Sequence, residues 1–483
     1  MKKILAWKSL VPFACLIAAL SAPLNAQEPA PSLRVGTSSL ALPNYRAQLS
    51  ISQSSPAADS AGTALTLEQL LEIARTSNPT LAQAKAGIQA AAGRTLQAGL
   101  WPNPTIGYAG DEIRGGAFGG GEQGLFVQQD IILGGKLGLD RKVLLAEGKQ
   151  TEAEAEEQRL RVENGVRVAF YQSLAAQKIV EIRVKLNGLA KDAAQTTQQL
   201  FNVGQADEPD LLQAQVEADQ ADLAVVTSQQ DQRRAWQVLS AVVGRPTMPV
   251  TPLQGSLEDL PSIDAGQVIQ TIVRDSPAVK IAKLGVIRAE ASLTRARREI
   301  VPNLSLRAGL SNDFEPLGAV PPPRVGLIGF AEVGVNLRLF NRNQGNMKAA
   351  EADVDRATFE VQRVSLVLRQ IAAPVLQSYE ASRSMAEKYK ASTLPNAQRA
   401  YELYLKRYRE GAAAYPQVLI AQRTLFDLQA SYMSALEAVW INATTLQGLL
   451  LTDGLDMPAA PGEIDRPVRE INMPIRETGE ANQ

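Results

Sequence analysis

The sequence predicts a mainly α-helical fold with a small β part. It contains one long unit twice, and each copy is mostly helical in pattern with one short alternating segment. An Asn-Pro pair at 78–79 opens a helical stretch that ends at a Trp-Pro-Asn sequence at 101–103. A Ser-Pro pair at 276–277 opens another, which ends at a Val-Pro-Asn sequence at 301–303. Each stretch is followed by a segment of alternating polarity and then by a very long helical pattern. The repeat far exceeds the period of about 20–50 residues that marks a solenoid. We therefore expect a pseudo-symmetric body built from two helix–hairpin–helix–helix units.

The composition excludes several classes of function. The 483 residues include 49 Lys and Arg and 50 Asp and Glu, so the net charge is −1 and nucleic-acid binding is not expected. The chain has no histidine, and its only cysteine is Cys15. Cys/His zinc sites, His-dependent triads and dithiol chemistry are therefore excluded. We expect no catalytic residues, no cofactor and no metal-binding site, and hence no enzyme.

The first 26 residues have the organisation of a cleaved signal peptide. Lys2, Lys3 and Lys8 precede or open an apolar core at 10–22, and Ala26 supplies a small residue before the cleavage point. The core is shorter than the about 17–25 residues of a membrane-spanning helix. Cys15 is interpreted as an apolar residue of this core, with lipidation as the alternative. The signal predicts export, and residues 27–62, rich in Ser, Ala and Pro, are expected to form a flexible leader.

The first repeat is predicted to span residues 63–250. Apolar periodicity, caps and prolines place its helices at about 79–100, 137–203 and 208–244, and its strands within about 104–133. A pre-proline residue is disfavoured in helical conformation, which is why the first of these helices is expected to stop before Pro102.

The second repeat is predicted to span residues 251–452, and residues 453–483 are expected to be disordered. Its helices are expected at about 277–300, 345–409 and 416–451, with strands within about 303–340. Pro374 lies inside the longest of these helices and is expected to kink or break it.

In the long helical patterns the apolar residues recur at alternating intervals of three and four positions, which indicates coiled-coil packing. In the second repeat the seam consists of Val354, Ala357, Val361, Val364, Leu368, Ile371 and Val375. The returning helix continues it with Leu425, Leu428, Tyr432, Ala435, Val439, Asn442, Leu446 and Leu449. In the first repeat the same rhythm runs from Leu211 to Val242.

The alternating segments have the pattern of membrane-spanning strands. Such strands need about 9–11 residues with an apolar face toward lipid and a polar face toward the interior. The polar side chains of the second repeat that point away from the apolar face, and are therefore candidates for lining a pore, are Arg307, Glu332, Asn336 and Arg338. Two hairpins cannot close a barrel, and open sheet edges are not viable in lipid. Several copies of the chain must therefore combine.

Together, the signal peptide, the duplicated unit, the two hairpins and the coiled-coil helices resemble the TolC-type outer membrane factors. The resemblance covers roughly residues 65–452. Three motifs carry it further: Leu-Gly-Gly-Lys at 133–136, Arg-Tyr-Arg-Glu-Gly at 407–411 and Val-Leu-Ile-Ala-Gln-Arg at 418–423. The last two are most similar to the heavy-metal-efflux, CzcC-type branch.

The resemblance implies a homotrimer in the outer membrane with a large periplasmic part. Three protomers would share one twelve-stranded β-barrel surrounded by outer-membrane lipid, continued by a hollow periplasmic α-barrel of twelve helical strands. It further implies a passive duct that is loaded by a periplasmic membrane-fusion adaptor and an inner-membrane pump of the RND type.

The resemblance also assigns roles to the helix–turn–helix ends. The turns at Val203-Gly204 and Glu410-Gly411 would be the periplasmic tips that dock the adaptor, and Asp210 and Tyr408 match a pair that closes the tip in some family members. This chain departs from the rest of that pattern, so a cation-selective gate at the tip is in doubt. The departures are Ala413, Gln417 and Ile420, where the family has an arginine and two carboxylates.

These observations give the functional hypothesis of an outer-membrane channel that carries heavy-metal cations in a tripartite efflux system. Two alternatives stay open. The duct could serve organic drugs or secreted polypeptides, because ducts of one architecture pass all of these. From another class, the chain could be a soluble periplasmic coiled-coil scaffold or adaptor, although the apolar hairpin faces count against this.

Overall fold

The order of secondary-structure elements repeats along the chain. The structure, a computed structural model, describes residues 64–113, 121–316, 324–410 and 415–456. The first series is α1 (Leu67–Ser77), α2 (Pro79–Ala98), β1 (Thr105–Asp111), β2 (Glu122–Ile131), α3 (Lys136–Asn202) and α4 (Glu208–Val243). The second is α5 (Val268–Asp275), α6 (Pro277–Arg298), β3 (Leu304–Pro316), β4 (Arg324–Val335), α7 (Gln344–Lys388), the π-helical turn η2 (Tyr389–Thr393), α8 (Leu394–Arg409) and α9 (Tyr415–Gln447). Predictions for the signal peptide, Cys15, the leader, Gly411 and the tail beyond residue 456 lie outside the described residues.

Equivalent caps open the equivalent helices α2 and α6. The Asn78 side chain accepts a hydrogen bond from the Thr80 backbone N–H at 2.9 Å, and the Ser276 side chain accepts one from the Ala278 N–H at 3.3 Å. In each case proline follows the cap at the first helical position, where its missing N–H costs nothing. The start signals predicted from the sequence are confirmed at both positions.

A left-handed residue links each hairpin to the long helix that follows. Gly135 before α3 has φ 69°, and Asn343 before α7 has φ 65°. Glycine adopts this conformation without a steric penalty, and asparagine is among the side chains that tolerate it best. The two repeats thus make the same sharp turn with different residues.

The four strands form one antiparallel sheet in the order β1-β2-β3-β4. Residues directly opposite each other across its centre include Leu125 and Leu310 on β2 and β3. The β2–β3 pairing joins the two repeats, and in the described part of the chain β1 and β4 remain as the open edges.

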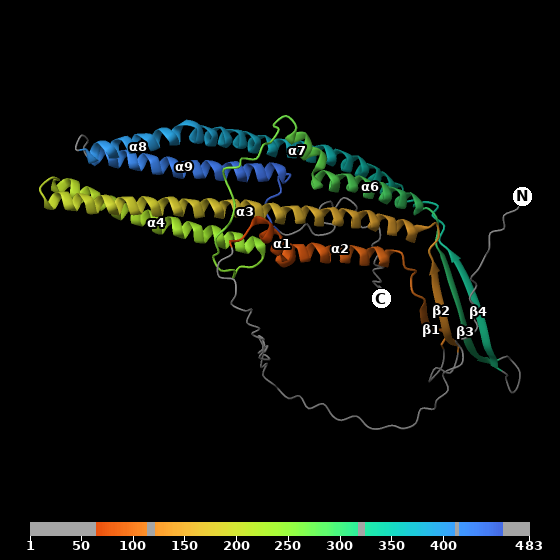
Figure 1. Ribbon diagram of the computed structural model, residues 1–483. Coiled ribbons are helices and arrows are strands. Elements are labelled where there is room, and N and C mark those ends of the chain that lie inside the picture. Colours follow the sequence, from red (N-terminus) through yellow and green to blue (C-terminus); the bar gives the residue numbers. More distant parts are fainter. Residues whose placement is uncertain (1–63, 114–120, 317–323, 411–414, 457–483) are drawn as a thin grey trace, which may run out of the picture. The chain divides into compact units, whose positions relative to one another are not determined.

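The long helices pack in a layer around α3. Along part of its length α3 contacts α2 and α6, and along the rest it contacts α4 and α9. Helices α6 and α9 in turn pack against α7, and α8 packs along α9 (Figure 1). No helix among the described ranges combines the length and the apolar character needed to cross a membrane.

The main hydrophobic core lies where the short helices α1 and α5 meet the long ones. Its fully buried side chains come from both repeats: Leu70, Val162, Leu239, Ile272 and Leu436 each have 0% exposure. Burying a side chain of this size contributes about 1.5–3 kcal/mol. The core therefore ties the two repeats into one body.

The heptad predictions are largely confirmed, with one error. Leu425, Tyr432, Ala435, Val439 and Leu446 of α9 are all buried. In α7, however, Ile371 is 48% exposed and Ala372 is fully buried in its place. An α-helix has about 3.6 residues per turn rather than 3.5, so a strict heptad drifts around a straight helix.

Of the two outcomes expected at Pro374, a kink or a break, the break does not occur. Helix α7 continues through Pro374, and the irregular turn is η2, immediately before Pro395 in α8. Proline clashes with the carbonyl four residues earlier in an α-helix, and a widened π turn relieves such a clash.

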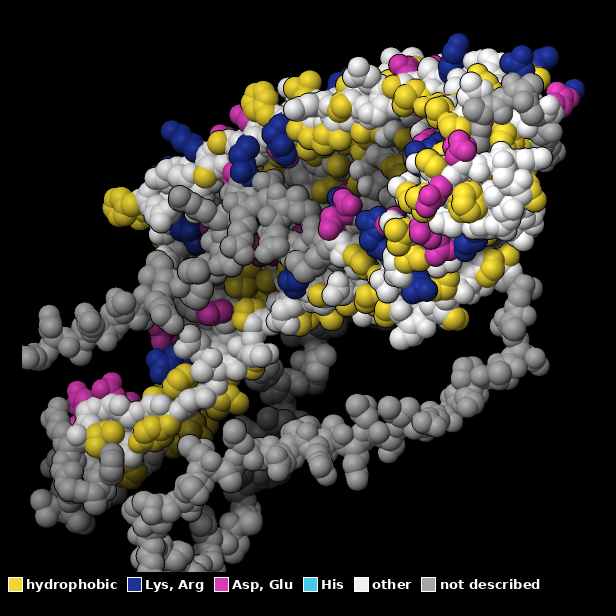
Figure 2. Space-filling model, turned by 90° about the vertical axis from the view of Figure 1, so that its left-hand side faces the viewer, with side chains coloured by type: hydrophobic (Ala, Val, Ile, Leu, Met, Phe, Trp, Pro, Cys, Tyr) yellow, Lys and Arg dark blue, Asp and Glu magenta, His cyan; other side chains and the backbone are white. Residues whose placement is uncertain are grey.

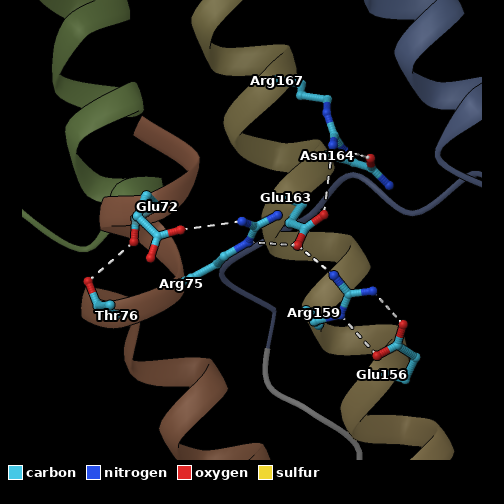
Figure 3. A network of polar contacts seen from close by, with 8 residues as sticks. All are labelled: Glu72, Arg75, Thr76, Glu156, Arg159, Glu163, Asn164 and Arg167. Carbon is cyan, nitrogen blue, oxygen red and sulfur yellow. Dashed lines mark hydrogen bonds and ion pairs between the residues drawn. The ribbon is translucent and has the colours of Figure 1, made fainter. Parts of the chain in front are cut away.

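Charged residues hold α1 against α3 beside this core. The Glu163 carboxylate on α3 lies 3.1 Å from Arg75 on α1, 2.7 Å from Arg159 and 3.7 Å from Arg167. Glu72 and Glu156 pair with the outer sides of Arg75 and Arg159 (Figure 3). The Glu163 side chain is only 7% exposed, so it is the buried centre of the network.

Hydrophobic side chains also lie among charged ones on the exposed surface of the helical part (Figure 2). Most of these residues lie on helices at the two ends of the layer. They include Leu96 on α2, Leu212, Val216, Leu223 and Val226 on α4, and Phe359 and Leu366 on α7.

Candidate functional site

One face of the sheet is apolar and solvent-exposed in the single chain. Ile106 is 72% exposed and Leu327 is 74% exposed. The strand register puts their apolar neighbours on the same face, because side chains alternate between faces along each strand. The further members of this face are Tyr108, Leu125, Val127, Leu310, Val333 and Val335. This is the face that the alternation predicted would meet lipid.

The opposite face carries Arg307 and Glu332, as their predicted orientation requires. The two residues are direct partners on β3 and β4, and an Arg307 amino group lies 4.0 Å from the Glu332 carboxylate. The Arg307 guanidinium also lies over two aromatic rings, 4.3 Å from the centre of Phe126 and 5.5 Å from the centre of Phe330. Sequence reasoning did not foresee the aromatic partners.

Asn336 and Arg338 do not belong to this strand face. Strand β4 ends at Val335, and the chain then turns toward α7. Arg338 instead pairs with Glu299 after α6. The alternation in the sequence continues past the end of the strand, which explains the error.

Arg338 is part of a charged cluster where the sheet meets the helices. Lys136, with a side chain only 2% exposed, donates to the Asn303 Oδ1 at 2.9 Å and lies 3.8 Å from Glu299. Arg295 contacts Asp140 at 2.6 Å and Glu299 at 2.5 Å. These contacts join the start of α3 to the end of α6 and to Asn303 just before β3, so the cluster fixes the sheet to both helices.

The turn between α3 and α4 closes α3 with a Schellman motif. Gly204 has φ 74°, its N–H donates to the Phe201 carbonyl at 3.0 Å, and the Gln205 N–H donates to the Leu200 carbonyl at 2.8 Å. Val203 at this turn is 67% exposed. Glu410 directly follows α8, and its N–H donates to the Lys406 carbonyl at 3.1 Å. The predicted tip residues that are described thus all lie at helix ends.

The two gate candidates lie near each other. Tyr408 on α8 hydrogen-bonds with the Thr197 side chain on α3, and it packs with Ala214 and Leu419. Burial raises the pKa of Tyr408; the bond with Thr197 lowers it, and the Asp210 carboxylate raises it. Asp210 lies in the first turn of α4, where its negative charge interacts favourably with the helix dipole. Tyr408 therefore connects the second repeat to the first beside the turn.

A second connection between the repeats lies close by and was not predicted. Arg423 on α9 binds both carboxylate oxygens of Glu217 on α4, one of them at 2.7 Å, and also contacts Gln220 at 3.1 Å. The Glu217 side chain is 7% exposed. The sequence signal for it was the arginine that ends the 418–423 motif, but nothing in the sequence indicated its partner.

Metal-ligating side chains do not cluster in the described ranges. Among these residues, no group of three or more Asp, Glu, His or Cys side chains is placed to hold a metal ion.

Comparison with known proteins assigns the repeats to one family. A family model described as outer membrane efflux protein matches residues 70–245 and 268–450. The cobalt-zinc-cadmium resistance protein CzcC of Cupriavidus metallidurans is 28% identical over 392 residues, 80% of this chain and 90% of CzcC. The cation efflux system protein CusC of Escherichia coli K12 is 26% identical over 295 residues, 59% of this chain and 63% of CusC. A crystal structure of CusC shares the fold, with a TM-score of 0.66 at 18% identity over 80% of this chain and 92% of that chain.

Proposed function

The chain belongs to the outer membrane efflux protein family, and we propose that it is the outer-membrane channel of a tripartite efflux system. In this proposal it forms a passive trimeric duct that carries heavy-metal cations to the exterior. A periplasmic membrane-fusion adaptor and an inner-membrane RND-type pump load the duct. The observation that carries the proposal is that the sheet and the helical layer, as described, each end on both sides in an element that has no neighbour beyond it.

Within the described ranges, both the sheet and the helical layer have unpaired edges. The sheet ends in β1 on one side and β4 on the other. The helical layer ends in α2 or α4 on the side of the first repeat, and in α7 or α8 on the side of the second. An open sheet with an apolar face is not viable in lipid. Copies joined edge to edge, first repeat to second, complete the sheet and the helical layer by the same operation.

Helix α4 supports this arrangement because it has apolar side chains on two opposite faces. Leu211, Ala214, Ala218 and Ala221 are buried against the rest of the protomer. The apolar residues on the other side are Leu212, Val216, Leu223 and Val226, which are 47–67% exposed. At 100° per residue, the two sets point in roughly opposite directions. A helix in the wall of a hollow barrel needs such neighbours on both sides.

The proposed cargo rests on the relatives. CzcC is named for resistance to cobalt, zinc and cadmium, and CusC for cation efflux. The duct itself needs no tight metal site, because a conduit passes its cargo without retaining it.

The proposed cargo is tested by the metal content of the cell. Deletion of the gene is expected to raise cellular zinc, cobalt or cadmium in the producing cell, measured by mass spectrometry, and re-expression is expected to restore the level. Unchanged metal content together with increased sensitivity to organic drugs would move the proposal to the drug-efflux alternative.

The proposed gate can be tested at Tyr408. Replacing Tyr408 by phenylalanine removes the hydroxyl that bonds with Thr197. A hydrogen bond of this kind contributes about 0.5–1.5 kcal/mol net, so the open probability of single channels in planar bilayers is expected to rise by about two- to tenfold.

The matched control for this test is Tyr404→Phe, one turn earlier on α8, where the side chain is 38% exposed. It is expected to leave the open probability unchanged. Equal behaviour of the two variants would remove Tyr408 from the gate.

A further inference from the structure

The polar face of the sheet is built in rows, and one row consists of glycines and phenylalanines. Across the four strands, Gly107, Phe126, Gly309 and Phe330 stand directly opposite one another. A Cβ added at Gly309 would lie 2.7 Å from the Phe330 ring, and one added at Gly107 would lie 2.5 Å from the Phe126 ring. The two rings therefore lie over the space that the glycines leave empty.

Arg307 occupies the neighbouring row and is held by these rings. Its guanidinium stacks over Phe126 and Phe330 at 4.3 and 5.5 Å, within the range of about 6 Å for a cation–π contact. Its pair with Glu332 at 4.0 Å is longer than the about 2.7–2.9 Å of a charge-assisted hydrogen bond. Its Nε is buried and has no hydrogen-bond partner among the described residues. The aromatic rings, more than the carboxylate, fix the position of this charge.

Among the side chains that the structure describes, the other charges on this face are acidic. At the end of the sheet near the hairpin loops, Asp111, Glu122 and Asp313 stand opposite one another in a single row on β1, β2 and β3. Nearer the helices, Asp130 lies on the same face as Arg307. Like charges in directly opposite positions destabilise a sheet, so this row of carboxylates does not contribute to the stability of the sheet.

We propose that Arg307 sets the charge selectivity of the duct by opposing the acidic rows on either side of it. The inference rests on the proposed function, because only a closed assembly turns this face into a pore lining. In a trimer, three such guanidinium groups, each opposite a Glu332 carboxylate, form a band without net charge between the acidic residues on either side. Rings of charged side chains determine which ions pass a pore. The band limits the preference for cations that the carboxylates alone would produce.

The test is the zero-current potential of the purified full-length assembly in planar bilayers under a KCl gradient. Arg307→Gln is expected to raise the permeability ratio of potassium to chloride by at least about twofold. Arg307→Lys keeps the charge and is expected to stay near the wild-type ratio. The charge-matched control is Arg274→Gln on α5, where the side chain is 72% exposed and pairs with Asp275. This control is also expected to stay near the wild-type ratio.

A reciprocal variant guards against loss of assembly in the first. Glu332→Gln removes the negative partner and is expected to lower the same ratio. Channels that conduct with unchanged ratios in both Arg307→Gln and Glu332→Gln would overturn the inference while leaving the duct intact. Absence of conductance from the wild-type assembly would instead contradict the proposed function, and the inference with it.

Discussion

Replacing Glu163 by alanine is expected to lower the free energy of unfolding by about 2 kcal/mol. Its side chain is 7% exposed and lies within 4 Å of Arg75, Arg159 and Arg167. Breaking a buried ion pair costs about 3–5 kcal/mol. The value here is smaller because the three arginines are 34–46% exposed and regain water when the carboxylate is lost. The midpoint of urea unfolding, followed by far-UV circular dichroism, measures the change.

Glu156→Ala is the matched control for this prediction. Glu156 lies on the same helix and contacts Arg159 at 2.6 Å, but its side chain is 48% exposed. A pair this exposed is expected to contribute at most about 1 kcal/mol. If both variants unfold at the same midpoint, the network in Figure 3 does not tie α1 to α3 in the way its geometry indicates.

Replacing Glu154 by glutamine is expected to stabilise the protein at neutral and alkaline pH. Glu154 is 9% exposed and its Oε2 has no hydrogen-bond partner among the described residues. Its pKa is raised from 4.5 to about 7, mainly by burial and also by Glu157 and Glu147 on the same helix, while Arg288 on α6 acts in the opposite direction. Because the folded state binds this proton more tightly than the unfolded state, the carboxyl favours folding less as pH rises from about 4.5 to 7.

The difference between Glu154→Gln and wild type therefore depends on pH. It is expected to be small near pH 4.5, to grow up to pH 7 and to remain constant above it, at about 2–3 kcal/mol. Unfolding midpoints at a series of pH values measure it. Glu152→Gln, two residues away and exposed, is the control and should show no such trend. A constant difference across the series would show that Glu154 is charged throughout.

Local patterns predicted the elements of this fold well, because local chemistry determines them. The caps at Asn78 and Ser276, the Schellman turn at Gly204 and the buried positions of α9 all follow from neighbouring residues. The polar orientation of Arg307 follows from strand alternation alone. Of the outcomes expected at Pro374, the break does not occur because the helix continues through it, while the structure places the irregular turn before Pro395.

Contacts between distant segments could not be predicted in the same way. Glu163 and Arg75 are 88 positions apart, and Arg423 and Glu217 are 206 apart. Many exposed charges in a long helix look the same in sequence, and only packing decides which of them become buried pairs. The stacking of Arg307 on Phe126 and Phe330 likewise depends on strand register across two hairpins.

The central claim is that the open protomer closes into a trimer in the outer membrane. Sucrose-gradient fractionation of membranes, followed by mass determination in mild detergent, tests it most directly. The proposal predicts recovery with the outer membrane at three times the mass of the mature protomer, after the bound detergent is subtracted. A soluble periplasmic monomer would contradict it and would favour a coiled-coil scaffold or adaptor instead.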